Sequence, residues 1–543
     1  MKITRRDFVR ISAAGLAASA IPQAMGLSSR NTTAGKPNIL LILADDMGYS
    51  DSQCYGGEIK TPNLAKLAEN GLRFTQLYST GRCWPSRACI LSGYYAQQIR
   101  RDKIKDRIEM GDRPGWAKLL PEMLKPAGYK SYHSGKWHID GTPIEAGFDR
   151  SWGRHQHGCD WDRFFDSKTW QEDGIKSPVK PGEPYYSTTA IADHTIACLK
   201  LHQQNTPDTP FFQFTAFYSP HWPLHALQED IDAYRGEYSR GWDLIRQQRW
   251  QRMKKMGIVD CALSKREDEI APSWNLKPDE LTEYLGEGEE GHAVAWDKLS
   301  EEQKKFQAEK MEIHAAMITR MDAEIGRIIA QLKEMGEYEN TLIIFVSDNG
   351  ASAELYMRGD GHDKNAPKGS AATFMCLGPG WSTAANTPFR LHKYWNHEGG
   401  ISSPCIVHWP RGIKDKGRLR HNPGHFIDFV PTALDAAGVE LQENAPARPG
   451  MSLLPAFAKD NTVKHEYLWW AHEGNRAIRK GDWKLTAGYG TGGPEQKWQL
   501  YNIKKDRCEM NDLAAKYPEK VQQLKKLWEE TVKQFENDLA DSG

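Results

Sequence analysis

The sequence lacks three features that would each indicate a particular class of protein. It has no net charge, since 71 basic residues balance 71 acidic ones, so no global field draws it to nucleic acid or to an anionic membrane. The apolar stretch 11–21 is too short and too rich in alanine and glycine to span a bilayer. The nine cysteines form no Cys-x-x-Cys pair, which disfavours a zinc module. We therefore expect no nucleic-acid partner and no membrane span.

The N-terminus has the features of an export signal. Arg5 and Arg6 precede the short apolar stretch 11–21, an arrangement that resembles a twin-arginine signal. A basic start to an amphipathic helix is the alternative interpretation. We expect residues 1–34 to be a signal peptide and linker, the export machinery to be a partner, and the mature protein to be periplasmic or secreted. The cleavage site stays open.

Apolar runs and helical patterns alternate along the 543 residues. Continuous apolar runs, typical of strands that helices cover on both faces, occupy 38–44, 211–217, 341–346 and 402–409. Helical patterns with start and stop signals occupy 62–70, 308–335 and 426–437. This alternation predicts an α/β protein with a large doubly wound sheet, mixed or parallel, flanked by helices. Ligands of such sheets bind beyond the carboxyl ends of the strands.

The chain is too long for one ordinary core, and its composition changes along its length. We expect a catalytic α/β domain over 35–440. The charged stretch at about 225–300 is an insertion in that domain, and a lid is one role for it. A linker rich in proline, alanine and glycine precedes a smaller α+β domain over 451–543, where short strand patterns are followed by a helical pattern.

Oxygen-bearing side chains follow two of the predicted strands. Asp45 and Asp46 follow the first apolar run, and Asp348 and Asn349 follow the run that ends at Val346. Hard cations prefer oxygen ligands, and the lack of imidazole in this set disfavours zinc. Taken singly, each pair is also explained as ordinary turn and cap residues. Together the two pairs predict a site for one Ca²⁺ per chain, with Mg²⁺ as the alternative ion.

The segment 81–93 contains Cys83, Pro85, Ser86 and Arg87 in the order Cys-x-Pro-Ser-Arg and ends in Leu-Ser-Gly. Pro85 favours a first helical turn, which puts residue 83 at a solvent-facing turn where backbone amides favour an anion. An unreactive cysteine in such a turn is the bland alternative. The segment resembles the signature of the type I sulfatases of the alkaline phosphatase superfamily. That resemblance implies that a maturation enzyme converts Cys83 to formylglycine, whose hydrate attacks the sulfur of a sulfate ester.

Three further segments are similar to the same family. The stretch 127–138 ends in Gly-Lys-Trp-His, as the family's second signature does, and it supplies Lys136 and His138. His221 lies in a Ser-Pro-His segment, and Lys393 precedes a Glu-Gly-Gly segment. The similarity extends from residue 38 to 409, and the smaller domain shares further elements. Serine at 402–403 and Cys89 depart from the usual pattern, which bears on the subfamily and leaves the reaction unchanged.

The resemblance implies a role for each residue of the site. Arg87 stabilises the deprotonated hydrate. Lys136 and Lys393 neutralise sulfate oxygens. His138 assists the release of sulfate, and His221 or Lys393 protonates the leaving oxygen. The implied metal ligands are Asp45, Asp46, Cys83, Asp348 and Asn349, and Asp348 also accepts the proton of the hydrate.

The predicted function is hydrolysis of sulfate monoesters with release of inorganic sulfate. A sulfated carbohydrate is favoured over a free aryl sulfate, because aromatic and histidine-rich loops suit sugar binding. A phosphodiesterase or phosphonate monoester hydrolase on the same fold is the first alternative. A non-catalytic binder of sulfated glycans is the second, if Cys83 is unmodified. The candidate pocket residues are Trp152, His155, His157, Asp160, Trp161, the insertion after Leu224 and the stretch 472–476.

Overall fold

The structure, a computed structural model, describes residues 35–154, 164–165, 170–176, 185–357, 361–441, 444–488 and 497–540. The predicted export signal lies outside these residues, as do His155, His157, Asp160 and Trp161. Residues Lys36–Gly543 form one compact unit. The division into domains at 440–451 therefore stays a prediction.

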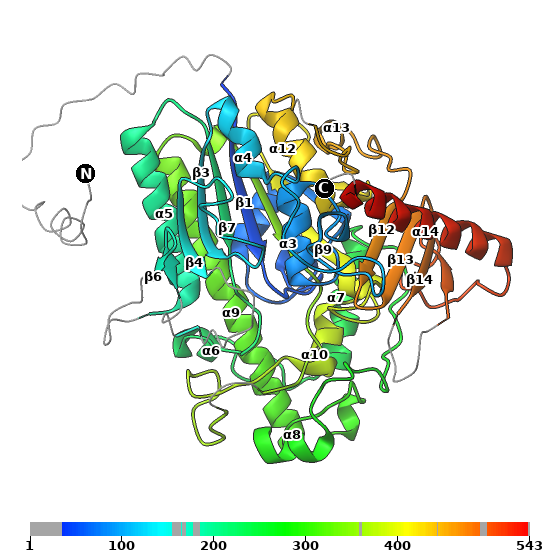
Figure 1. Ribbon diagram of the computed structural model, residues 1–543. Helices are drawn as coiled ribbons and strands as arrows, with labels where there is room; N and C mark the ends of the chain where they lie inside the picture. Colours follow the sequence, from blue (N-terminus) through cyan, green and yellow to red (C-terminus); the bar gives the residue numbers. More distant parts are fainter. Residues whose placement is uncertain are drawn as a thin grey trace, which may run out of the picture. The chain divides into compact units, whose positions relative to one another are not determined.

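One large mixed sheet forms the centre of the described part of the chain (Figure 1). Its strand order is β10-β2-β9-β8-β1-β7-β3-β4-β5-β6, and β11 pairs with β2. Strands β8, β1, β7, β3 and β4 run parallel, whereas β9 is antiparallel to both β8 and β2. The predicted fold class is confirmed. The strands are β1 (Asn38–Ala44), β2 (Leu72–Tyr78), β3 (Lys130–Lys136), β4 (Arg150–Arg154), β5 (Gln171–Glu172), β6 (Ile175–Lys176), β7 (Phe211–Ala216), β8 (Thr341–Ser347), β9 (Ser402–His408), β10 (Arg418–Arg420) and β11 (Gly424–His425).

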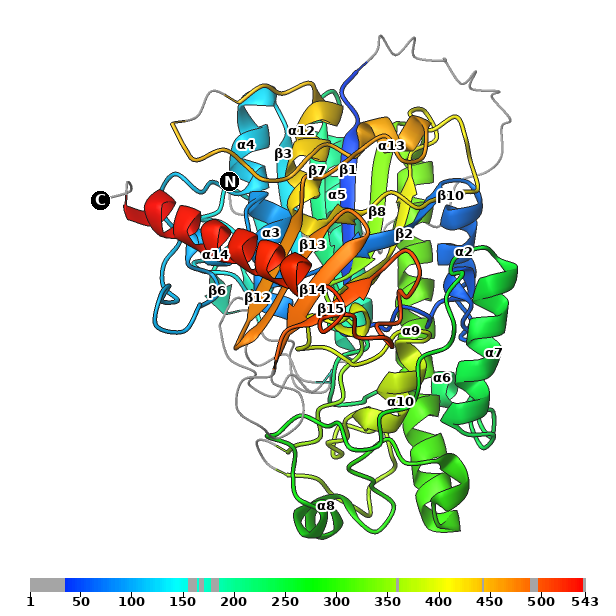
Figure 2. The same ribbon diagram turned by 90° about the vertical axis from the view of Figure 1, so that its right-hand side faces the viewer.

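Helices cover both faces of this sheet (Figure 2). One layer consists of α2 (Pro62–Glu69), α5 (Ser187–Asn205) and α9 (Glu301–Glu334), and the other of α3 (Cys83–Ser92), α4 (Leu120–Leu124) and α12 (Phe429–Ala437). Side chains of a strand alternate between the two faces. Accordingly Leu40 and Ile42 of β1 lie in the core that contains α9, and Leu41 and Leu43 lie in the core that contains α3. The continuous apolar run of β1 follows from this two-sided burial.

The predicted insertion is helical and partly built into the core. It contains α6 (Gln228–Asp232), α7 (Trp242–Lys255) and α8 (Pro278–Leu285). Trp242 is buried and packs edge-to-face on Trp296 at 4.8 Å and on Trp381 of α10 (Gly378–Ala385) at 5.5 Å. This packing holds α7 against the core, so we do not expect α7 to move as part of a hinged lid.

The C-terminal region has a sheet of its own, as predicted. Four antiparallel strands, β12 (Leu468–His472), β13 (Asn475–Lys480), β14 (Trp483–Ala487) and β15 (Gln499–Asn502), pair in sequence order. The helix α14 (Pro518–Ala540) lies across them (Figure 1). Trp528 of α14 stacks on Trp469 of β12 with ring centroids 5.5 Å apart. This aromatic packing joins the helix to the sheet.

A buried ion network joins the two sheets. Glu398 begins α11 (Glu398–Ile401), which leads into β9, and it accepts hydrogen bonds from Lys484 of β14 and from Arg507, both at 3.0 Å. Lys484 also lies 2.9 Å from Glu509, and the Glu509 carboxylate accepts the backbone N–H of Glu398 at 2.7 Å. Burial makes each of these charges costly without its partners. The Glu-Gly-Gly segment is therefore anchored by residues about 100 positions further along the chain.

The remaining short elements are the helix α13 (Leu454–Ala458) and 3₁₀ helices at Gln53–Tyr55, Gln97–Ile99, Lys125–Ala127, Trp296–Lys298, Tyr338–Asn340 and Phe426–Asp428. Of the helices that the structure describes, none combines the length and the apolar character needed to span a lipid bilayer.

Candidate active site

The carboxyl ends of four neighbouring strands bring the predicted side chains together. Asp45 and Asp46 follow β1, and Asp348 and Asn349 follow β8, the parallel neighbour of β1. On the other side of β1, Lys136 ends β3, and the loop after β7 carries His221. The site thus forms at one edge of the parallel part of the sheet, where ligands of such sheets bind.

Arg87 of α3 lies fully buried and contacts three of these strand ends. Its guanidinium donates to Asp348 Oδ2 at 2.8 and 3.1 Å, to Asp45 Oδ2 at 3.4 Å and to the Lys136 carbonyl at 2.9 Å. Lys136 Nζ donates to the same Asp45 Oδ2. Burial and the neighbouring carboxylate of Asp45 raise the pKa of Asp348, although Arg87 opposes the shift. Burial would raise the pKa of Asp45 too, but Lys136, His221 and Arg87 outweigh it and hold that pKa below its usual value.

Two buried oxygens of the cluster have no hydrogen-bond partner among the described residues, Asp45 Oδ1 and Asn349 Oδ1. The other polar atoms of these side chains are used, since Asn349 Nδ2 donates to Asp46 Oδ1 at 2.7 Å. Buried polar atoms are rarely left unpaired, and oxygens are the ligands of hard cations. The donor set therefore fits a divalent cation bound beside Asp45 and Asn349.

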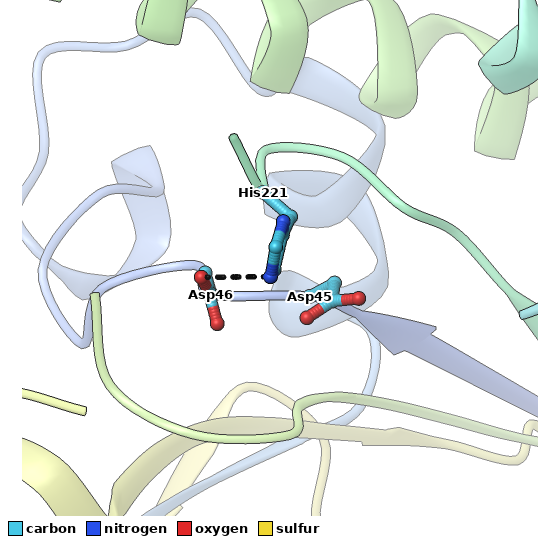
Figure 3. A group of neighbouring side chains, drawn as sticks. All are labelled: Asp45, Asp46 and His221. Atoms are coloured by element: carbon cyan, nitrogen blue, oxygen red, sulfur yellow. Dashed lines mark ion pairs between the residues drawn. The ribbon is translucent and has the colours of Figure 1, made fainter. Parts of the chain in front are cut away.

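Asp46 faces His221 (Figure 3), and Lys393 also lies beside it. His221 Nε2 lies 3.6 Å from Asp46 Oδ2 and 3.2 Å from Lys393 Nζ, and Lys393 donates to Asp46 Oδ2 at 2.8 Å. Asp46 has a left-handed backbone conformation, with φ 63°, which is strained for a residue other than glycine. Oxygens of Asp45 and Asp46 and a ring nitrogen of His221 lie within 4.8 Å of one another, so a metal ion could also include His221. The sequence had placed no imidazole in this set.

The ring of His221 is neutral in this arrangement. Its Nδ1 lies 2.6 Å from the carbonyl of Trp222, which accepts only a protonated nitrogen, so Nε2 is left to accept from Lys393. Burial lowers the pKa of His221 to about 4, with Lys393 adding to the shift and Asp46 opposing it. Burial alone would lower the pKa of Lys393, but Asp46 and Glu354 raise it above its usual value. Lys393 is therefore the cation of this pair.

Backbone geometry fixes the position of Lys393. It lies between Leu391, with φ 65°, and Tyr394, with φ 90°, two strained conformations that the surrounding structure must maintain. Beneath this loop, Gly400 packs against its backbone so closely that a Cβ atom would lie 2.0 Å from the Trp395 carbonyl oxygen. The Glu-Gly-Gly segment therefore supports residues 391–395, which we call the lysine loop.

Cys83 is the first residue of α3, as predicted, but it is not solvent-facing. Only 4% of its surface is exposed. Burial raises the pKa of its thiol to about 11, although Lys136 and Lys393 oppose the shift. Ser86, three residues further on, has a structural part, because its hydroxyl accepts the backbone N–H of Thr80 at 3.1 Å. At neutral pH an unmodified Cys83 is therefore a thiol, which is a poor nucleophile.

Two charged residues of the site were missed in the sequence. Glu354 is buried, accepts from Arg82 Nη1 at 2.9 Å and from Trp222 Nε1 at 3.2 Å, and lies 3.5 Å from Lys393 Nζ. Arg82 was visible as the neighbour of Cys83. Glu354 belongs to no motif and lies 272 positions from Arg82, so only the fold reveals it.

Aromatic rings from distant segments contact Trp84, the residue after Cys83, or one another. Trp84 makes edge contacts with His138 at 5.8 Å and with His472 at 5.1 Å, and His472 contacts Tyr394 at 5.5 Å. His472 Nδ1 donates to Asp102 at 2.8 Å. In the described part of the chain, the buried His472 Nε2 and Trp84 Nε1 have no hydrogen-bond partner. We call Trp84, His472 and Tyr394 the aromatic wall. Of the three, His472 is fully buried and Tyr394 is 7% exposed, so Trp84 is the ring with the most accessible surface.

The comparisons with known proteins identify one family. Residues 37–439 match the family model "Sulfatase", and residues 390–537 match the model "N-sulphoglucosamine sulphohydrolase, C-terminal". The chain is 30% identical over 455 residues to an arylsulfatase of Klebsiella aerogenes, covering 77% of this chain and 90% of the relative. It is 28% identical over 556 residues to an N-acetylglucosamine-6-O-sulfatase of Bacteroides thetaiotaomicron, covering 93% and 88%. The crystal structure of Ps i-CgsB in complex with k-i-k-neocarrahexaose superposes with a TM-score of 0.64 at 24% identity, covering 92% of this chain and 93% of the other, a likeness of fold.

Proposed function

Because this chain belongs to the sulfatase family of the alkaline phosphatase superfamily and is a sulfuric ester hydrolase, we propose that it removes sulfate from a sulfated carbohydrate. The nucleophile derives from Cys83, and a divalent cation assists. The observation that carries the proposal is the pair of buried, unpartnered oxygens on Asp45 and Asn349 in the cluster of charged groups around Cys83.

The cation would be held by Asp45, Asp46, Asp348, Asn349 and residue 83, with Ca²⁺ favoured and Mg²⁺ as the alternative. When bound, it would polarise the sulfate and favour a deprotonated hydroxyl at residue 83. Arg87 and Lys136 hold Asp45 Oδ2, which leaves Asp45 Oδ1 for the ion. Asn349 is oriented in the same way, because its Nδ2 is bound to Asp46.

The state of Cys83 supports the need for a modification. A buried thiol with a raised pKa is largely protonated at neutral pH, so it attacks poorly. Formylglycine would supply a hydrated aldehyde with two hydroxyls, one to attack sulfur and one to expel sulfate afterwards. His138, which follows β3, assists that second step by taking the proton. A formylglycine-generating enzyme is then a required partner.

The charges of the site suit an anionic substrate. Four carboxylates, of Asp45, Asp46, Asp348 and Glu354, are paired with four basic side chains, of Arg82, Arg87, Lys136 and Lys393. The side chains alone are balanced, so a divalent cation makes the site positive, which attracts a sulfate ester. Lys136 and Lys393 then hold the sulfate oxygens. His221, adjacent to Lys393, lies on the side of the leaving oxygen.

A carbohydrate is supported by the aromatic wall. Sugar rings pack on aromatic side chains, and their hydroxyls need hydrogen-bond partners. The partly exposed Trp84, the residue after Cys83, provides such a ring, and its Nε1 and His472 Nε2 have no hydrogen-bond partner in the described part of the chain. The relative from Bacteroides thetaiotaomicron is named for a sulfated amino sugar. The basic N-terminal segment supports export to the periplasm or beyond, where such polymers are degraded.

The decisive experiment combines mass spectrometry with substrate comparison. Protein produced with a maturation enzyme should carry formylglycine at residue 83, and it should desulfate N-acetylglucosamine 6-sulfate. Nitrophenyl sulfate, a nitrophenyl phosphodiester and a phosphonate monoester serve as comparison substrates. Cys83→Ala is the matched inactive control. Fully active protein with an unmodified thiol would refute the nucleophile, and faster turnover of the phosphodiester or phosphonate would favour the alternative function.

A further inference from the structure

Two cysteines from distant parts of the chain lie in contact. Cys261, which follows α7 in the insertion, and Cys508, which follows β15, have their sulfur atoms 3.4 Å apart across a sequence separation of 247. Cys508 is 1% exposed, and its sulfur also lies 2.9 Å from the Ala262 carbonyl oxygen and 3.2 Å from that of Pro388. A disulfide has an S–S length of about 2.05 Å, so the two atoms need to approach by only about 1.4 Å.

We propose that Cys261 and Cys508 form a disulfide bond that joins the insertion to the C-terminal region. Of the described cysteines, these two alone have their sulfurs within contact distance. Cys54, Cys89, Cys198, Cys376 and Cys405 are buried, and burial raises the pKa of each thiol. Those five fit inert core thiols.

An oxidant can reach the two thiols unequally, and this difference identifies which sulfur attacks first. Cys261 is half-buried and lines a cavity of about 910 Å³ together with His421, Lys464, Arg479 and Arg507, so a small oxidant can reach it. The hydrogen bond from Cys508 lowers the pKa of Cys261, and Arg507 contributes in the same direction. Cys508 lies behind it. Cys261 is therefore the thiol that reacts first.

The oxidant is a disulfide, and the reaction is thiol–disulfide exchange. The Cys261 thiolate attacks one sulfur of the oxidant, which forms a mixed disulfide and releases one thiolate. Cys508 then loses its proton and attacks Cys261 Sγ, which releases the second thiolate. Two protein thiols are oxidised to one disulfide, and the oxidant disulfide is reduced to two thiols.

The disulfide would link the insertion to the C-terminal region at a place where both contact the segment before Lys393. The insertion contacts the segment before Lys393 through Ser264, whose N–H donates to the Pro388 carbonyl at 3.0 Å, and through an ion pair between Glu267 and Arg390. Arg390 donates in turn to the Glu509 carbonyl at 2.9 Å. Cys508 lies between Arg507 and Glu509, which hold Glu398. A covalent link here stabilises the support of the lysine loop.

Peptide mapping of the exported wild-type protein tests the bond directly. The protein is alkylated in denaturant and digested without reductant. We expect a cross-linked peptide pair that contains Cys261 and Cys508, and two fewer free thiols than in a sample reduced first with dithiothreitol. Protein made reduced should form the same pair on treatment with oxidised glutathione. Finding both residues alkylated after both treatments, or either one paired with a different cysteine, overturns the proposal.

Thermal unfolding gives a second readout. A cross-link that closes a loop of this length stabilises mainly by restricting the unfolded chain, so dithiothreitol should lower the Tm by roughly 5 °C. Cys261→Ser should have the Tm of the reduced wild type and no response to reductant. Cys54→Ser is the matched control and should keep the full response. If dithiothreitol lowered the Tm of Cys261→Ser and of wild type equally, the proposed disulfide would be contradicted, whatever the catalytic activity.

Discussion

Replacement of Asn349 tests the metal site most sharply, because this residue has one unpartnered oxygen and one used nitrogen. Asn349→Asp puts a carboxylate oxygen where Nδ2 now lies, 2.7 Å from Asp46 Oδ1. At an effective dielectric constant of about 20, two like charges at that distance repel by about 6 kcal/mol. Uptake of a proton limits the cost. Protonating an ordinary aspartate at pH 7 costs about 4 kcal/mol, so the metal-free variant should lose up to about 4 kcal/mol of unfolding free energy.

A bound cation reverses the sign of this effect on stability, because it attracts the carboxylate added by Asn349→Asp. We expect Asn349→Asp to have a lower Tm than wild type in EDTA and a larger rise in Tm on addition of Ca²⁺. Asn349→Ala removes the unpartnered oxygen and should show a much smaller rise. Asn340→Ala, at the opposite end of β8, is the matched control and should respond to Ca²⁺ as wild type does.

Differential scanning fluorimetry in EDTA and over a series of Ca²⁺ concentrations measures these shifts without any substrate. The reasoning would fail if Asn349→Ala and Asn340→Ala gave the same Ca²⁺-induced rise in Tm as wild type. It would also fail if Asn349→Asp were equally stable with and without the ion. Repeating the series with Mg²⁺ distinguishes the two candidate cations.

The remaining predictions concern the nucleophile, the leaving oxygen and the buried ion network. Cys83→Ala should abolish desulfation while it changes the unfolding free energy by only about 1 kcal/mol, since one buried sulfur atom is lost; residual turnover would contradict this. Because the neutral His221 accepts from Lys393, the proton for the leaving oxygen is expected to come from Lys393, so His221→Ala should lose similar kcat on a sulfated sugar and on nitrophenyl sulfate, and a much larger loss on the sugar would make His221 the acid. Lys484→Met should lower the unfolding free energy by about 3 kcal/mol in urea titrations, because two buried carboxylates lose their shared cation, whereas the exposed Lys480→Met should change it little. Burial raises the pKa of Glu398, but Lys484 and Arg507 outweigh it and hold that pKa below its usual value, so the stability it contributes should be lost as the pH falls below about 4.5; a flat acid limb would contradict this.

Local sequence signals predicted the fold class and the edge of the sheet where the site forms. The run 38–44 is apolar throughout because both faces of β1 are covered, and the polar residues Asp45 and Asp46 follow where the strand ends. The same logic located Asp348 and Asn349 after β8. The four side chains meet because β1 and β8 are adjacent and parallel, and that adjacency was not predicted from the sequence.

Contacts between distant segments could not be predicted in this way. Glu354 has no motif, and its part in the site depends on Arg82 and Lys393 approaching it in the folded chain. The burial of Cys83 likewise depends on how the surrounding segments close over α3. The helical order of the insertion was missed because its aromatic residues pack on α10, which lies about 140 positions from Trp242. The catalytic roles of the site residues stay predictions.

The buried ion network has a consequence for the order of events during synthesis. Glu398 leaves the ribosome 86 residues before Lys484 and 109 residues before Arg507. At about 5–20 residues per second, its partners arrive roughly 4 to 20 s later. Until then Glu398 has neither of the two cations that neutralise it in the finished fold, so burying its carboxylate is costly. Under the proposed conversion of Cys83, a maturation enzyme needs access to this residue, which is only 4% exposed in the finished fold. We therefore expect the proposed conversion to take place before Lys484 and Arg507 complete the network, while Cys83 is still accessible.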